Sequence, residues 1–237
     1  MKRHIPNLIT LCNLVCGCVA VLRGFEADYE GALLWICGGA LFDFFDGFAA
    51  RLLGVSSDIG KELDSLADDI TFGLAPAAVC FSLIADAVKP ELPHAVLTVL
   101  PYLAFVMAAM SGLRLAKFNL DTRQANTFIG LPTPANALFW SALAVGAQEW
   151  LATSPWAAWT VLAGVLVMSA LLVSEIPMFA LKFKHFGLKG NGLRYGFLIL
   201  SAALLLCLGL TGLALIVPLY VAVSVVAVFF THKTTVA

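Results

Sequence analysis

The residues LFDFFDGFAARLLGVSSDIGKELDSLADDITFG, numbers 41–73, place seven acidic side chains inside a strongly apolar stretch. In that stretch only Arg51 and Lys61 carry the opposite charge. The rest of the chain is apolar as well, since 61% of its 237 residues are hydrophobic and 12% are charged. Soluble domains carry about 25% charged residues, so this chain cannot cover a water-facing surface with polar groups. The composition therefore predicts an integral membrane protein.

Long apolar runs follow one another along the chain. A bilayer core about 30 Å thick needs roughly 20 mostly apolar residues in each helical span. Eight runs meet this requirement, at 6–23, 31–53, 62–86, 94–116, 131–149, 155–176, 193–209 and 212–231. The last two are separated by two residues, which predicts a tight hairpin or one bent re-entrant unit. We predict an all-α integral membrane protein with about eight transmembrane helices, and six or seven as the alternative counts.

The basic residues predict the orientation of these spans. With eight spans both termini lie on one side, together with twelve of the fourteen lysines and arginines. Arg23 and Lys89 lie on the other side. Because loops rich in lysine and arginine remain in the cytoplasm, we predict that both termini and the turn between the second and third spans are cytoplasmic. The protein is then integral to the cytoplasmic (inner) cell membrane.

The acidic residues fall into two stripes at helical spacing. The stripe on the second span holds Asp43, Asp46, Gly47 and Ala50, and the stripe on the third holds Gly60, Asp64 and Asp68. Residues three or four apart share one face of a helix, and a short turn brings the two faces together. The glycines and the alanine leave room for a ligand or a second backbone. Asp58, Glu62 and Asp69 can instead be ordinary solvated residues at the membrane interface.

Four carboxylates in a half-buried space repel one another unless a cation or protons neutralise them. Hard divalent cations with oxygen ligands are the natural neutralising group, and Mg²⁺ or Mn²⁺ keeps coordination positions free for phosphate oxygens. The stripes therefore predict a divalent-metal site built from Asp43, Asp46, Asp64 and Asp68. Arg51 lies one turn beyond Gly47, where it can contact phosphate or cytidine or simply anchor the helix end at the cytoplasmic surface.

The same positions spell a longer signature, Asp43-x2-Asp46-Gly47-x2-Ala50-Arg51-x8-Gly60-x3-Asp64-x3-Asp68. This pattern resembles the signature of the CDP-alcohol phosphotransferase family, with every position filled. The resemblance implies a membrane enzyme in which an alcohol attacks a CDP-linked substrate and CMP leaves. It implies two divalent ions, Mg²⁺ or Mn²⁺, held by the aspartates on the diphosphate. It also implies that Asp68 is the general base, although the residues alone leave Asp68 open as base, ligand or both.

The resemblance also suggests nucleotide contacts around the metal site. The predicted CDP-binding set is Asn7, Thr10, Asp43, Gly47, Ala50, Arg51 and Gly60. Asn7 and Thr10 belong to the opening segment IPNLITLCNLVCG (5–17), and the alternative for both is helix capping at the membrane surface.

Other segments narrow the resemblance to the phosphatidylserine synthase branch of the family. DSLADDITFGLAPA (64–77) and SGLRLAKFNLDTRQANTFIGLPTPANA (111–137) resemble blocks of those synthases, except that Lys117 stands where arginine is more usual. The implied reaction transfers the phosphatidyl group of CDP-diacylglycerol to L-serine. Free serine carries a carboxylate, so we predict that Arg114, helped by Lys117 or Asn119, binds it.

The resemblance covers roughly residues 1–180 and leaves two helices after it. We predict one integral membrane domain over 1–237, with a six-helix family core at 1–180 and a two-helix extension at 190–232. A homodimer is expected by resemblance, membrane lipid is the expected surrounding partner, and no nucleic-acid partner is predicted. The alternatives are the same chemistry on glycerol 3-phosphate or an inositol phosphate, or transport of divalent cations.

Overall fold

The computed structural model describes residues 4–55, 57–88, 93–121, 128–178, 187 and 191–234. The helices are α1 (His4–Phe25), α2 (Tyr29–Leu53), α3 (Asp58–Asp68), α4 (Ala75–Ala87), α5 (His94–Val99), α6 (Val106–Leu120), α7 (Thr133–Gly146), α8 (Gln148–Thr153), α9 (Ala157–Val173), α10 (Gly192–Leu208) and α11 (Leu213–Thr234). Shorter elements are the π-helical turn η1 (Asp69–Leu74), the 3₁₀ turns η2 (Leu100–Phe105) and η4 (Gly209–Gly212), and the strands β1 (Phe128–Ile129) and β2 (Pro177–Met178). The two short strands pair in antiparallel fashion.

Within the described residues, five helical stretches are long and apolar enough to cross a membrane. They are His4–Phe25, Tyr29–Leu53, Asp58–Ala87, His94–Leu120 and Gly192–Val226. This confirms an all-α membrane protein. Helices overlap all eight predicted segments, but the count of eight spans and the cytoplasmic termini stay predictions.

Two predicted spans are shorter or broken in the structure. The segment predicted at 131–149 is divided at Ala147, where α7 ends and α8 begins, because the backbone there (φ −113°, ψ 15°) leaves the helical region. The 14 residues of α7 rise only about 21 Å at 1.5 Å per residue, less than a bilayer core. The 17 residues of α9 rise about 26 Å.

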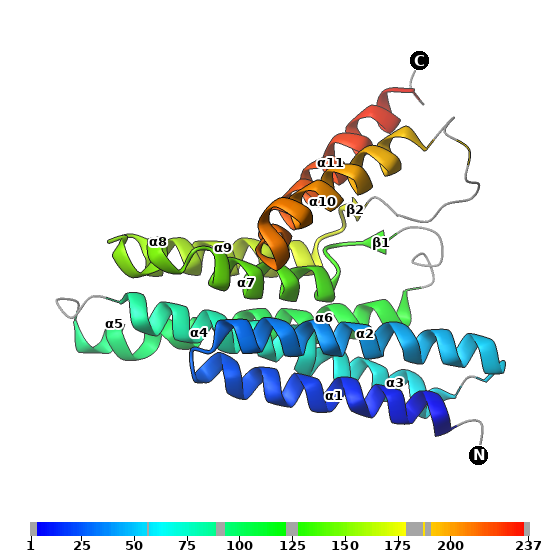
Figure 1. Cartoon of the computed structure of the whole chain (residues 1–237), viewed down its shortest axis with the longest axis horizontal. Helices are drawn as coiled ribbons and strands as arrows, with labels where there is room; N and C mark the ends of the chain where they lie inside the picture. Colours follow the sequence, from blue (N-terminus) through cyan, green and yellow to red (C-terminus); the bar gives the residue numbers. More distant parts are fainter. Residues whose placement is uncertain are drawn as a thin grey trace.

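Figure 1 shows the helices stacked in layers. The layer made by α1, α2, α3–α4 and α6 lies beneath α7, α8 and α9, and the hairpin of α10 and α11 leaves this stack at an angle. The hairpin turn passes through Gly209, whose φ of 60° with ψ of −149° is a conformation that essentially only glycine adopts. Val217 of α11 is buried in the main core, so the hairpin packs against the bundle. The predicted division into core and extension stays a prediction.

The main core lies between α4, α6, α7 and α9. Trp140 is its largest fully buried side chain, and it packs where Gly164 of α9 has no side chain. A Cβ atom on Gly164 would lie 2.8 Å from the indole ring. Leucines and phenylalanines cover much of the outside, for example Leu8, Phe44 and Leu206, as expected for helices that lipid surrounds.

A smaller contact joins α1, α2 and the π-helical turn beside the acidic stripes. Thr71 of this turn donates a hydrogen bond to the Asn13 carbonyl at 3.1 Å. Gly17 of α1 and Gly39 of α2 face Thr71 so closely that a Cβ atom on either would clash with it. These glycines let three backbone segments meet, and that close meeting sets the position of the third span against the first two.

Candidate active site

Three of the four predicted aspartates lie close together. One carboxylate oxygen from each of Asp43, Asp64 and Asp68 lies within 4.8 Å of the other two. Asp43 comes from α2, while Asp64 and Asp68 lie one turn apart on α3. The two predicted stripes therefore do face each other. Three carboxylates this close favour a bound cation, because each raises the electrostatic energy of the others.

The fourth aspartate, Asp46, is buried beside this group and is oriented by α1. The hydroxyl of Thr10 lies 2.6 Å from Asp46 Oδ2 and 3.0 Å from the carbonyl of Pro6. Its single proton can be donated to either oxygen, and donation to the carboxylate gives the stronger, charge-assisted bond. Thr10 thus orients an acidic residue at this site.

Asp68 is held by a residue that the sequence analysis missed. The side-chain amide of Asn13 donates to Asp68 Oδ1 at 3.1 Å, and Asn13 is fully buried. Asn7, Thr10 and Asn13 recur at intervals of three on one face of α1. A polar residue that continues this face into an apolar run is the signal that could have identified Asn13.

The π-helical turn begins directly after Asp68. A π turn inserts an extra residue into the helical repeat, so side chains beyond it point in a different direction from those of a continuous α-helix. Asp69, the first residue of this turn, lies toward α6, where a Cβ atom on Gly112 would be 3.3 Å from its Oδ2. Asp68 thus contacts α1 and belongs to the acidic cluster, whereas Asp69 faces α6 and does not join it.

A cavity of about 280 Å³ opens beside the aspartates. Its lining residues are Pro6, Asn7, Thr10, Asp46, Gly47, Ala50, Val55, Ser57, Gly60, Lys61 and Asp64. This set includes five of the seven residues predicted to bind the nucleotide. A Cβ atom on Gly60 would lie 3.0 Å from Asn7 Oδ1, so the glycine keeps this part of the cavity open.

The basic residues near the cavity differ from the prediction. Arg51 is exposed and is absent from the lining, and its guanidinium lies alongside Gly47, 3.8 Å from where a Cβ would be. Lys61 does line the cavity, and its ammonium donates to the backbone carbonyl of Asn119 at 2.8 Å. Lys61 was not among the residues predicted to bind the nucleotide.

The three residues predicted to bind the serine substrate lie in two different surroundings. Arg114 is buried, and its guanidinium lies 5.1 Å from the centre of the Phe118 ring. Asn119 instead donates from its side-chain amide to the Ser65 hydroxyl at 2.8 Å. Lys117 is exposed and borders a small cleft with Arg114. The structure therefore brings Arg114 and Lys117 together and leaves Asn119 apart from them.

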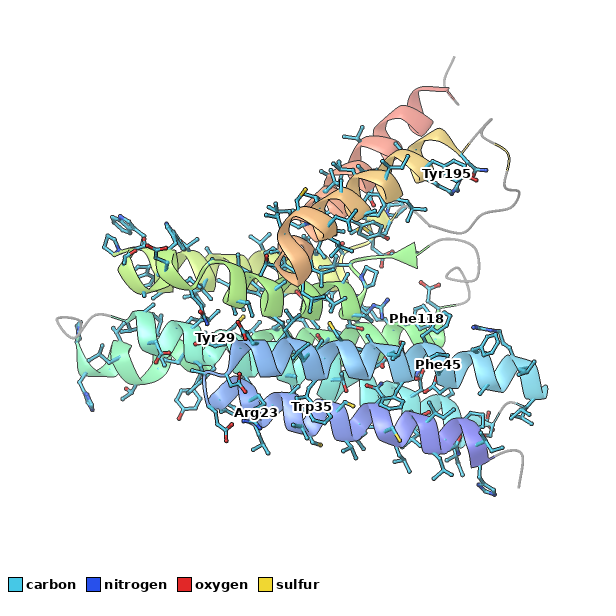
Figure 2. All side chains as sticks on the ribbon, viewed as in Figure 1. Arg23, Tyr29, Trp35, Phe45, Phe118 and Tyr195 are labelled. Atoms are coloured by element: carbon cyan, nitrogen blue, oxygen red, sulfur yellow. The ribbon has the colours of Figure 1, made fainter. Side chains whose placement is uncertain are left out.

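These residues lie toward one end of the bundle. Figure 2 shows Phe45 of α2 and Phe118 of α6 toward that end, whereas Arg23 and Tyr29 mark the turn between α1 and α2 away from it. The bond between Lys61 and Asn119 joins α3 to the end of α6 on the same side. The acidic cluster, the cavity and Arg114 therefore occupy one part of the molecule.

The model of the CDP-alcohol phosphatidyltransferase family matches residues 3–175. This chain belongs to that family. The match covers the acidic cluster, the cavity and Arg114, and it ends before α10. The resemblance drawn from the signature is confirmed at the level of the family.

Individual relatives match over much of the same region. The CDP-diacylglycerol–serine O-phosphatidyltransferase of Bacillus subtilis (strain 168) is 39% identical over 135 residues, which are 55% of this chain and 70% of that protein. Its counterpart in Mycobacterium leprae (strain TN) is 35% identical over 186 residues, or 73% of this chain and 57% of that protein. The protein of that name in Methanocaldococcus jannaschii is 30% identical over 174 residues, or 73% of this chain and 75% of that protein.

Proposed function

We propose that the protein transfers the phosphatidyl group of CDP-diacylglycerol to the hydroxyl of L-serine and releases CMP. The observation that carries this proposal is the meeting of Asp43, Asp64 and Asp68 within 4.8 Å beside an open cavity. Membership of the CDP-alcohol phosphatidyltransferase family and the names of the relatives support the same reaction. Phosphoryl transfer needs positioning and charge stabilisation more than covalent chemistry, which suits a site made of carboxylates and a cavity.

The cavity beside the aspartates is the proposed binding site for the nucleotide part of the donor, CDP-diacylglycerol. Asn7, Thr10, Gly47, Ala50 and Gly60 line it, so we assign the cytidine nucleotide to this space. Arg51, which lies beside Gly47 outside the cavity lining, would reach a phosphate of the nucleotide, and Lys61 adds a second cation to the cavity itself. The acyl chains would remain in lipid beside the apolar helix surfaces.

The aspartates fit a pair of divalent ions, Mg²⁺ or Mn²⁺. Asp64 Oδ1 is buried and has no hydrogen-bond partner among the described residues, and a carboxylate oxygen in that condition suits a cation. Asp43, Asp46 and Asp64 would hold the ions, with Asp68 as a further ligand or the base. Bound ions would neutralise the diphosphate and polarise the phosphorus that the acceptor attacks.

Asp68 is the candidate for general base. Its carboxylate is buried and is oriented by Asn13, so it can take the proton of an acceptor hydroxyl at a defined place. The hydroxyl oxygen then bonds to phosphorus while the bond to CMP breaks.

The proposed setting follows from the apolar helices and the family. We place the protein in the inner cell membrane with the active site facing the cytoplasm, surrounded by membrane lipid, and as a homodimer. The excess of basic residues on one side supports this orientation, since the aspartate cluster lies at the same side in the predicted topology.

A comparison of acceptors tests the proposed reaction. Purified protein with CDP-diacylglycerol and Mn²⁺ is expected to release CMP when L-serine is added, and to make phosphatidylserine. Glycerol 3-phosphate and inositol phosphate are expected to give at most a few per cent of that rate, measured as CMP by chromatography. CMP release that responds to one of these phosphorylated acceptors instead would contradict serine. Uptake of divalent ions into vesicles without CMP release would favour transport.

Replacement of Arg114 by lysine is expected to raise the KM for serine about tenfold or more, because Lys has no bidentate fork for a carboxylate. The KM for CDP-diacylglycerol is expected to stay unchanged, and initial rates at varied serine and varied donor measure both constants. Asn119→Ala is the matched comparison, because Asn119 lies on the same helix but bonds to Ser65. Serine kinetics that respond to Asn119→Ala and not to Arg114→Lys would contradict the assignment.

A further inference from the structure

A small cleft borders Arg114 on the side formed by the end of α6, β1 and the end of α9. We call it the α6–α9 cleft. Its charged residues are Arg114 and Lys117 on α6, Asp121 just after α6, and Glu175 just after α9. Leu172 and Ile129 supply apolar wall. Two cations and two acids therefore border one space.

Arg114 connects this cleft to the acidic cluster. Its side chain is within electrostatic reach of Asp68, and it is 8% exposed. One terminal nitrogen lies 3.5 Å from the Thr133 hydroxyl, which is a long bond, while Nε is buried without a hydrogen-bond partner among the described residues. A buried guanidinium with an unused donor is costly unless a ligand or water completes it.

The two signs of charge in the cleft match an amino acid better than a simple alcohol. A zwitterion carries a carboxylate and an ammonium on one carbon atom, so a site that selects it needs a cation and an acid close together. The enclosed part of the cleft is about 20 Å³, enough for one group the size of a water molecule. An ammonium group has about that size.

Building on the proposed function, we infer that Asp121 and Glu175 bind the ammonium group of the acceptor serine in the α6–α9 cleft. Arg114 and Lys117 hold its carboxylate, and the hydroxyl is left toward Asp68. The two acids are thus specificity-determining residues that select an amino-acid acceptor. A phosphorylated acceptor would bring its dianion against them, and that repulsion disfavours glycerol 3-phosphate and inositol phosphate.

Two acceptors that differ only in the ammonium group test this inference. L-Serine and 3-hydroxypropanoate share the hydroxyl and the carboxylate, and only serine carries the ammonium. The measurement is kcat/KM for both acceptors in the unaltered protein and in Asp121→Asn, Glu175→Gln and the double variant. The control is Glu62→Gln, because Glu62 is an exposed acid of α3 that borders neither the cavity nor the cleft.

The unaltered enzyme is expected to favour serine over 3-hydroxypropanoate, and the double variant to reduce that preference about tenfold or more, since charge-assisted hydrogen bonds have this strength. The loss is expected in the KM for serine, with 3-hydroxypropanoate and CDP-diacylglycerol kinetics unchanged. An unchanged preference would overturn the inference, and so would an equal loss for both acceptors, because acids that merely position Arg114 would affect both. No serine-dependent CMP release by the unaltered enzyme would overturn the proposed function itself.

Discussion

Replacement of Asp68 by asparagine is expected to lower serine-dependent CMP release about a thousandfold, because general bases contribute factors of this size. Asparagine has nearly the same shape, and its oxygen can still accept the bond that Asn13 donates to Asp68. The variant is therefore expected to fold and to bind CDP-diacylglycerol. The measurement is kcat at saturating serine and donor, with donor binding measured separately on the same preparation.

The dependence of the remaining activity on divalent ions distinguishes the two roles of Asp68. If the residue acts only as base, the ion concentration that gives half of the remaining rate stays the same. If it is also a ligand, that concentration rises. Asp58→Asn is the matched control, because Asp58 is an exposed acid in the first turn of the same helix. An Asp68→Asn enzyme that keeps more than a tenth of the rate would contradict the role of base.

Removal of divalent ions is expected to abolish activity and to lower the melting temperature. Because the oxygens lie within 4.8 Å of one another, each pair of charged carboxylates repels by at least about 3.5 kcal/mol at an effective dielectric constant of about 20. Bound ions replace this repulsion with attraction, so a chelator should lower the melting temperature by about 5 °C or more. Mg²⁺ or Mn²⁺ should restore both the melting temperature and CMP release.

The Asp43→Asn variant provides a second test of the predicted effect of divalent ions on the melting temperature. The substitution removes one of the three charges and so relieves part of the repulsion without ions. The ion-free variant is therefore expected to melt no lower than the ion-free unaltered protein, while its gain on adding ions is smaller. Thermal unfolding in detergent gives the melting temperature of the unaltered protein and of the variant, each with and without chelator. An unaltered protein whose rate and melting temperature ignore the chelator would contradict a metal site.

Much of the acidic site could be predicted because helical spacing is a local property. Asp43 and Asp46 are three residues apart, and Asp64 and Asp68 are four apart, so each pair shares a face in any α-helix. A turn of a few residues between the spans then limits how the faces can meet. The family signature rests on the same local spacing, and the family is confirmed.

The candidate residues for binding the serine substrate were harder to predict, because their spacing does not indicate which neighbouring helix each side chain contacts. Arg114 and Asn119 are five apart on α6, so they point to different sides of the helix. Which side faces the acidic cluster depends on the rotation of α6 against α3. The bond from Asn119 to Ser65 shows which side Asn119 takes, and nothing in the sequence around it indicates that partner.

The sequence by itself determined the apolar helical character, the two acidic stripes and the family, because composition and spacing within one helix suffice for these. Only the tertiary structure decided that Asn13 holds Asp68, that Asp69 faces α6, and that Arg114 shares a cleft with two acids. Each of these depends on contacts between helices far apart in sequence. The close approach of three backbones at Gly17 and Gly39, for example, brings α1, α2 and the π turn together beside Asn13.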